Sequence, residues 1–319
     1  EWVGLADWGK LGAVVLKTIT KEAWQGNRPR HRYVETPSGM LNSIGLQNVG
    51  VEKFVREKMP AAREFGTKII VSIGGKSEEE FGELAARFDE TEGVAALEGN
   101  ISCPNVKAGG MAFGVSPKAV AKVTGLVKSR TRLPVFPKLT PNVTDIGEIA
   151  KACEDAGADA IALINTFSGM AIDIHSRRPL LAANFGGLSG PAIRPAALLR
   201  VYQTAQAVGI PLIGMGGIMT TQDALEFIIA GASAVQVGTA LFCNPKAAHE
   251  ILAGIEAFVG EKERKSLEPL LSTPLSNTQL YLGKMLAAVI PPVLASYIGI
   301  ALYTIGVFWL VGPMPFVSV

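Results

Sequence analysis

One cysteine stands where a general base could act. Cys103 follows an apolar run and precedes Pro104, in a loop whose neighbours carry amides or hydroxyls. An unperturbed thiol has a pKa of about 8.5, so a cysteine can accept a proton when its surroundings favour the thiolate. An inert buried cysteine is the alternative. It is our interpretation of Cys153, which lies in a helical pattern, and of Cys243, which follows a strand. Cys103 is therefore the candidate catalytic residue.

A set of asparagines accompanies this cysteine. An amide side chain carries both donors and acceptors, so several asparagines together can bind a planar ligand that itself contains amide groups. Turn formation is the alternative, and it is the favoured interpretation for one member, Asn142. The set consists of Asn42, Asn100, Asn105, Asn142 and Asn165.

A lysine and two glycine-containing pairs indicate an anionic ligand. Lys138 ends an apolar run, where its ammonium could stabilise an anionic ring, although a solvated strand end is the alternative. Gly216-Gly217 and Gly238-Thr239 follow two later apolar runs. Backbone N–H groups at such turns can approach a phosphate closely. Tight turns without a ligand are the alternative for each pair.

These residues follow strands in a repeating pattern of strands and helices. Seven β-branched runs are predicted as strands: residues 12–17, 68–73, 94–102, 135–139, 160–165, 211–215 and 234–237. Amphipathic stretches at 77–88, 117–129, 145–156, 195–207 and 221–230 are predicted as helices. Such alternation indicates parallel βαβ units.

We expect a (β/α)₈ barrel that lacks its first strand, because seven strands are counted and the eighth would precede Glu1. The catalytic groups of such barrels lie at the carboxyl ends of the strands, and a phosphate site lies late in the chain. A doubly wound open sheet is the alternative, but its usual Gly-x-Gly-x-x-Gly turn is not visible.

Composition narrows the functional class. Charged residues make up 18% and hydrophobic residues 48% of the 319 residues, which excludes an intrinsically disordered chain. A net charge of +2 gives no basic surface for nucleic acid. The three cysteines cannot all pair, which favours a reducing, cytoplasmic setting. The three histidines are far apart, so we expect no histidine metal site.

The C-terminal part changes character. A charged run at residues 260–265 is followed, after Lys284, by a stretch without any charged side chain, and residues 285–311 are mostly apolar. A membrane-spanning helix needs about 20 such residues. We therefore divide the chain into a barrel at 1–259, a charged linker at 260–284 and a predicted transmembrane helix at 285–311. A buried core helix is the alternative for the last segment.

Ordered motifs give the barrel segment a family resemblance. Asn-Ile-Ser-Cys-Pro-Asn-Val-Lys at residues 100–107, Lys-Leu-Thr-Pro-Asn-Val-Thr at 138–144 and Gly-Met-Gly-Gly-Ile at 214–218 are three of them. With further motifs between residues 4 and 259, the chain resembles class 1 dihydroorotate dehydrogenases of subclass B. The resemblance implies oxidation of (S)-dihydroorotate to orotate in pyrimidine biosynthesis, with FMN as cofactor. Another FMN barrel acting on a pyrimidine or a dihydrouridine is the alternative.

The resemblance also implies roles for individual residues. Cys103 would remove the C5 proton of dihydroorotate, and a hydride would pass to FMN. The implied substrate-binding residues are Lys17, Asn42, Ser43, Ile44, Gly45, Leu46, Asn100, Asn105, Asn165 and Thr166. The implied FMN-binding residues are Lys17, Thr18, Asn100, Lys138, Ile164, Gly190, Gly216, Gly217, Gly238 and Thr239. The family further implies a homodimer and an iron–sulfur and FAD subunit that passes electrons to NAD⁺.

The last 60 residues have a different resemblance. Residues 260–276 and the apolar span after Lys284 resemble a piece of an ABC-2 type transporter permease. This implies a chimera joined near residues 259–265, whose tail contacts a membrane. A non-functional fusion of an enzyme with a transporter fragment is therefore a further alternative to an active dehydrogenase.

Overall fold

A computed structural model describes residues 7–28, 31–101 and 113–263. The chain divides into two compact units, residues 1–255 and 256–319. Cys103, Asn105 and the predicted span at 285–311 lie outside the described residues. Within the described ranges, we find no helix that is both long and apolar enough to cross a bilayer. The following paragraphs concern the first unit.

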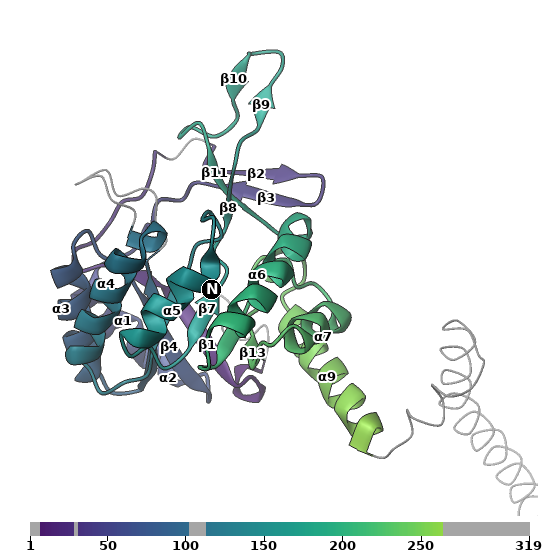
Figure 1. The fold of residues 1–319 in the computed structure, drawn as a ribbon. Coiled ribbons are helices and arrows are strands. Elements are labelled where there is room, and N and C mark those ends of the chain that lie inside the picture. Colours follow the sequence, from purple (N-terminus) through teal and green to yellow (C-terminus); the bar gives the residue numbers. More distant parts are fainter. Residues whose placement is uncertain (1–6, 29–30, 102–112, 264–319) are drawn as a thin grey trace, which may run out of the picture. The chain divides into compact units, whose positions relative to one another are not determined.

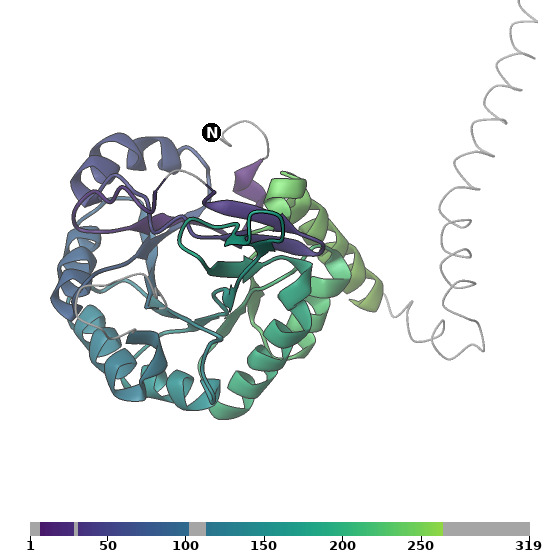
Figure 2. The ribbon, with the colours of Figure 1, turned by 90° about the horizontal axis from the view of Figure 1, so that it is seen from above.

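Seven parallel strands form one curled sheet. They are β1 (Ala13–Ile19), β4 (Lys68–Ile73), β5 (Val94–Asn100), β6 (Val135–Leu139), β7 (Ile161–Leu163), β12 (Leu212–Gly214) and β13 (Ala234–Val235). Each of these seven strands pairs in parallel with the next of the seven, so that the order in the sheet, β1-β4-β5-β6-β7-β12-β13, follows the order in the sequence. Figure 2 shows these strands around a central axis with helices outside them. A doubly wound sheet would reverse its strand order partway, so the sequential order confirms the barrel-type sheet.

Five amphipathic helices cover the outside of the sheet at the predicted places. They are α3 (Glu78–Asp89), α4 (Pro117–Ser129), α5 (Ile146–Asp155), α6 (Arg194–Ala207) and α7 (Thr221–Ile229). Side-chain caps explain several of their starts. Ser77 accepts a hydrogen bond from the Glu80 N–H, and Thr220 forms a reciprocal capping box with Asp223.

The core lies between this helical layer and the sheet. On α3, the buried residues Phe81, Leu84, Ala85 and Phe88 recur at helical spacing on one face. Leu97, Leu139 and Leu163 are fully buried on successive strands of the sheet. The buried faces of the helices and of the strands therefore form one continuous core. This core supports the carboxyl ends of the strands rigidly.

Smaller elements complete the chain. The remaining helices are α1 (Val51–Glu57), α2 (Met59–Arg63), α8 (Ala240–Cys243) and α9 (Ala247–Glu263), with 3₁₀ turns at Trp8–Lys10, Phe113–Val115 and Pro191–Ile193.

Cys153 is completely buried in α5, where burial raises the pKa of its thiol to about 12. The expected burial of Cys153 is confirmed. Cys243 is exposed in α8, so its expected burial was wrong, because the short α8 leaves this residue outside the core.

A second, antiparallel sheet was not predicted. It has the order β2 (Tyr33–Thr36), β3 (Gly39–Asn42), β11 (Gly186–Ser189) and β8 (Phe167–Gly169). A hairpin of β9 (Ile172–Asp173) and β10 (Arg178–Pro179) extends from it. These segments follow the carboxyl ends of β1 and β7, and Figure 1 shows them above the barrel. The second sheet therefore builds one wall over the face where barrels carry their sites.

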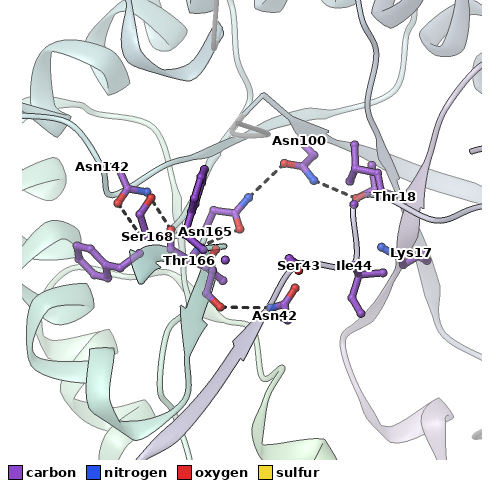
Figure 3. A pocket seen from close by; sticks show the side chains of 16 residues that line it. Lys17, Thr18, Asn42, Ser43, Ile44, Asn100, Asn142, Asn165, Thr166 and Ser168 are labelled. Carbon is purple, nitrogen blue, oxygen red and sulfur yellow. Dashed lines mark hydrogen bonds between the residues drawn. The ribbon is translucent and has the colours of Figure 1, made fainter. Parts of the chain in front are cut away.

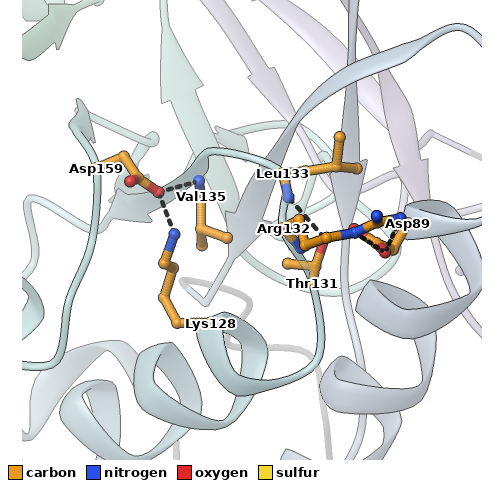
Figure 4. Close-up of polar contacts among 7 residues, drawn as sticks. All are labelled: Asp89, Lys128, Thr131, Arg132, Leu133, Val135 and Asp159. Carbon is orange, nitrogen blue, oxygen red and sulfur yellow. Dashed lines mark hydrogen bonds and ion pairs between the residues drawn. The ribbon is translucent and has the colours of Figure 1, made fainter.

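The opposite ends of the strands are tied by two carboxylates (Figure 4). Asp89 accepts hydrogen bonds from the Arg132 N–H at 2.7 Å and the Thr131 hydroxyl at 2.8 Å. These bonds hold the pKa of Asp89 below its ordinary value, the backbone bond contributing most. Asp159 accepts from the Val135 N–H and from Lys128, each at 2.7 Å. The two carboxylates therefore fix the loop that leads into β6.

Candidate active site

A first cavity of ≈ 230 Å³ lies at the carboxyl ends of the barrel strands, under the second sheet (Figure 3). It is lined by Lys17, Thr18, Asn42, Ser43, Ile44, Gly45, Leu46, Asn100, Asn142, Asn165, Thr166, Phe167, Ser168, Phe185, Gly186 and Gly187. Among these described residues Lys17 carries a charge and no carboxylate is present. The lining therefore suits a small ligand that carries a negative charge.

A chain of hydrogen bonds crosses the floor of this cavity. The Thr18 and Ser72 hydroxyls are 2.9 Å apart, and the Asn100 amide donates to Thr18 Oγ1 at 3.1 Å. Asn165 Nδ2 then donates to Asn100 Oδ1 at 3.2 Å. The chain connects β1 and β4 to β5 and to the residues after β7, and Figure 3 shows the bonds that link Thr18, Asn100 and Asn165. The ends of four strands thus hold one polar surface in place.

The asparagines differ in what they can offer to a ligand. An amide has two N–H donors and two acceptor lone pairs. Asn100 and Asn165 each use one donor and one acceptor within the described residues. Asn42 makes one long bond, to the Gly187 carbonyl at 3.5 Å. These three amides therefore retain both donors and acceptors that can bind a ligand.

The segment from Asn42 to Leu46 forms another wall of the cavity. Asn27 holds it, because its side chain donates to the Ser43 carbonyl at 2.8 Å and its backbone N–H donates to the Ile44 carbonyl at 3.0 Å. Gly45 has a φ of 75°, and a Cβ there would lie 2.7 Å from the Asn27 nitrogen. The Ser43 hydroxyl is buried in this wall and has no partner among the described residues. Such an atom lacks a hydrogen bond that a bound ligand or water can supply.

A second cavity of ≈ 160 Å³ adjoins the first, and Asn165 and Thr166 line both. Its other lining residues are Lys138, Ile164, Ser189, Ile193, Met215, Gly216, Gly217, Ile218, Met219, Gln236, Gly238, Thr239 and Ala240. It lies between the ends of β6, β7 and β12 and the residues after β13. The two cavities therefore share one wall, formed by the two residues that follow β7.

Glycines shape the far end of the second cavity. Gly216 and Gly217 have φ values of 129° and 80°, which L side chains rarely adopt. A Cβ on Gly217 would lie 2.7 Å from the Gly190 carbonyl oxygen, whereas a Cβ on Gly238 would meet nothing within 4 Å. Gln236 Oε1 is buried here without a partner among the described residues. Space and an unsatisfied acceptor together indicate room for a ligand.

Lys138 enters this cavity from β6 as part of a buried ion pair. Its Nζ lies 3.4 Å from Oε1 of Glu98, and the two side chains are 18% and 5% exposed. Glu98 lies on β5, two residues before Asn100. The alternative of a solvated strand end is therefore wrong for Lys138, because its charge is held inside the barrel mouth by a buried carboxylate.

The whole barrel segment matches one protein family. Residues 1–259 match the family described as dihydroorotate dehydrogenase. The chain belongs to the dihydroorotate dehydrogenase family. It is 56% identical over 261 residues to the "Dihydroorotate dehydrogenase B (NAD(+)), catalytic subunit" of Desulforamulus reducens, covering 82% of this chain and 86% of that protein. It is 53% identical over 271 residues to the protein of the same name in Geotalea uraniireducens, covering 85% and 88%.

The cavities of this dehydrogenase are lined by most of the residues predicted from the sequence. The first contains every described member of the predicted substrate set, and the second contains Lys138, Ile164 and both glycine-containing pairs. Gly190 lines neither; its carbonyl instead lies against Gly217. Asn105 and the predicted base Cys103 lie outside the described residues.

Sequence reasoning missed several lining residues of the dehydrogenase. They are Phe167, Ser168, Phe185, Gly186, Gly187, Ser189, Ile193, Met215, Ile218, Met219, Gln236 and Ala240. Many belong to the unpredicted antiparallel sheet or follow it. Asn142, interpreted mainly as a turn residue, also lines the first cavity. Asn142 lies four residues after Lys138 in the motif at residues 138–144, and this position could have indicated that it lines the site.

Proposed function

We propose that the chain is the catalytic subunit of an FMN-dependent dihydroorotate dehydrogenase, which oxidises (S)-dihydroorotate to orotate. The observation that carries this proposal is the pair of adjoining cavities with Asn165 and Thr166 as their common wall. One cavity is rich in amides and the other is bounded by glycines, so a pyrimidine and a phosphate-bearing flavin can lie side by side. Family membership and 52–56% identity to the catalytic subunits support the same activity.

The first cavity is the proposed pyrimidine site. Asn42, Asn100 and Asn165 have amide groups available, which complement the alternating N–H and C=O groups of the dihydropyrimidine ring. The substrate carboxylate is an anion, and Lys17 supplies the positive charge in this lining. Ser43 to Leu46 close the opposite side of the ring, as the family resemblance implies.

The second cavity is the proposed FMN site, and its residues fit that group. Gly216-Gly217 and Gly238-Thr239 would hold the phosphate, because glycines let backbone N–H groups approach its oxygens. Lys138 would lie beside the ring system, where its ammonium stabilises negative charge. Ile164 also lines this cavity, and Lys17, Thr18 and Asn100, which line the first cavity, complete the proposed set together with Gly190, which lines neither. When bound, FMN supplies the acceptor for the hydride that leaves the substrate.

The proposed oxidation consists of a proton transfer and a hydride transfer. The C5–H bond breaks and its proton goes to the thiolate of Cys103, the proposed base. The C6–H bond breaks and its hydrogen leaves with both electrons. The electron pair of the former C5–H bond forms the C5=C6 double bond of orotate, so two electrons and two hydrogens are removed in balance. Asn100 and Asn165 hold the ring while both bonds break.

A partner subunit completes the proposed enzyme. The relatives carry the names "catalytic subunit" and "NAD(+)", which fit an assembly in which another chain delivers electrons to NAD⁺. We propose an iron–sulfur and FAD subunit for this role and a homodimer of the catalytic chain. The transporter-like interpretation of residues 260–319, with its membrane contact, stays a prediction, because nearly all of these residues lie outside those that the structure describes.

Anaerobic mixing tests the proposed function. Purified protein is reconstituted with FMN, L-dihydroorotate is added without oxygen, and the visible absorbance of oxidised flavin is followed. We expect the absorbance to bleach as orotate appears. The Cys103→Ala variant is expected to retain FMN but not to bleach. If the FMN-loaded parent keeps its colour with dihydroorotate, or if Cys103→Ala bleaches at the parent rate, the proposed function or its base is wrong.

A further inference from the structure

The edge of the antiparallel sheet is completed by a side chain. Within the described residues β8 is the last strand of this sheet and pairs on one side with β11. On its other side, Asn142 Nδ2 donates to the Thr166 carbonyl at 3.0 Å, and Asn142 Oδ1 accepts from the Ser168 N–H at 3.0 Å. Figure 3 shows both bonds. A single residue of a parallel partner strand would bond the same two groups, so the amide substitutes for a neighbouring strand.

Asn142 has little bonding capacity left for a ligand. Besides donating to Thr166, its Nδ2 donates to the Thr140 hydroxyl at 2.9 Å. Both amide hydrogens are then used, and one of the two acceptor positions is occupied by Ser168. This distinguishes Asn142 from Asn100 and Asn165, whose amides keep a donor available. Although Asn142 lines the first cavity, its bonds are directed at the protein.

The segment that Asn142 holds is the wall between the two cavities. Thr166 and Asn165 line both cavities, and Phe167 lines the first. From the other side this segment is constrained by Gly187, because a Cβ there would overlap the Thr166 side chain. Without the Asn142 amide, the Thr166 carbonyl and the Ser168 N–H would lose the partner that each has on this side among the described residues.

We propose that Asn142 is a positioning residue that fixes Thr166–Ser168 and thereby sets the affinity of the first cavity for a planar pyrimidine. The proposal rests on the proposed function, since orotate serves as the probe. Loss of one or two such hydrogen bonds predicts roughly three- to ten-fold weaker binding of orotate by Asn142→Ala. FMN binding is expected to change less than two-fold, because the glycine-lined end of the second cavity does not contact Asn142.

Two variants and one control test this role. Asn142→Ala removes the whole clamp, and Thr140→Val removes only the hydroxyl that anchors it. Asn244→Ala is the control, because Asn244 also uses both ends of its amide, with Glu250 and the Lys246 N–H, but lines neither cavity. For each protein the measurements are the orotate Kd, from the change in flavin absorbance, the FMN Kd, the melting temperature, and hydrogen exchange at the Ser168 amide.

The proposal expects three results for Asn142→Ala: weaker orotate binding, faster exchange at Ser168, and a melting temperature no lower than that of Asn244→Ala. Thr140→Val should shift the orotate Kd in the same direction by less. An orotate Kd within two-fold of the parent, or unchanged exchange at Ser168, would overturn it. If the parent itself does not bind orotate, the proposed function fails instead, and exchange at Ser168 still decides whether Asn142 clamps the strand.

Discussion

The ion pair between Lys138 and Glu98 makes the chain sensitive to one substitution. Their charged atoms lie 3.4 Å apart, and the Glu98 side chain is 5% exposed. At an effective dielectric constant of about 20, two unit charges at this distance attract by about 5 kcal/mol. Desolvation of both ions offsets most of this attraction in the intact protein. The net stabilisation by the pair is therefore small, whereas breaking the pair is costly.

Lys138→Met is accordingly expected to lower the free energy of unfolding by about 3–5 kcal/mol, because it leaves the Glu98 carboxylate buried without its partner. The double variant Glu98→Gln with Lys138→Met should regain most of this loss, since no carboxylate is then left buried without its partner. Urea unfolding followed by circular dichroism measures both. It is done with and without saturating FMN, because bound ligand adds its own stabilisation.

The exposed pair of Arg63 and Glu92 is the control. Its atoms lie closer, at 2.9 Å, but the side chains are 40% and 86% exposed. Arg63→Met is therefore expected to cost less than about 1 kcal/mol. If Lys138→Met lost no more stability than Arg63→Met, or if the double variant were less stable than Lys138→Met, the argument that burial governs this pair would be refuted.

Four other substitutions test separate parts of the structure. Gly99→Ala should raise the free energy of unfolding by about 0.5–1 kcal/mol, because a Cβ there meets no atom closer than 3.9 Å; a lower melting temperature would contradict this. Gly217→Ala should lower the melting temperature and weaken FMN binding, because Gly217 has a positive φ and its Cβ would meet the Gly190 carbonyl. Gly238→Ala should weaken FMN binding alone, because its Cβ would meet nothing within 4 Å. Equal melting temperatures for the two variants would contradict this reasoning. Because the pKa of Asp89 is lower in the folded chain than its ordinary value, the ionised carboxylate stabilises the fold at neutral pH, and this stabilisation is lost as the pH falls and Asp89 is protonated. The difference in unfolding free energy between the parent and Asp89→Asn should therefore narrow below about pH 4. A difference that does not change with pH would contradict this role of Asp89.

The parallel sheet was predictable because its strands have strong local signals. Residues 68–73 and 135–139 are apolar runs bounded by helical patterns, and both formed strands at those positions. The antiparallel sheet gave no such signal. Its strands have three or four residues. β8 (Phe-Ser-Gly) and β11 (Gly-Gly-Leu-Ser) contain glycines and no β-branched residue, so no strand signal marks these two. The pairing of β3 with β11, which unites the sheet, joins segments more than 100 residues apart in the chain.

The candidate site was predictable to the extent that it lies at strand ends. Asn100, Lys138 and Asn165 end or follow strands of the parallel sheet, and the barrel brings such positions together. Glu98 was not singled out, because only the fold shows that its carboxylate is buried beside Lys138. Asparagine is a common turn residue, so the sequence alone favoured a turn at Asn142. Its bonds to Thr166 and Ser168 depend on the second sheet, which the sequence did not predict.

The central claim is that the pyrimidine and the flavin lie in adjoining cavities with a common wall. Titration of the FMN-loaded protein with orotate tests it most directly, with the visible spectrum of the flavin as the signal. We predict a saturable change in the flavin band at one orotate per bound FMN. Binding of orotate that leaves the flavin spectrum unchanged would contradict the claim, because a pyrimidine in the first cavity must alter the surroundings of a flavin in the second.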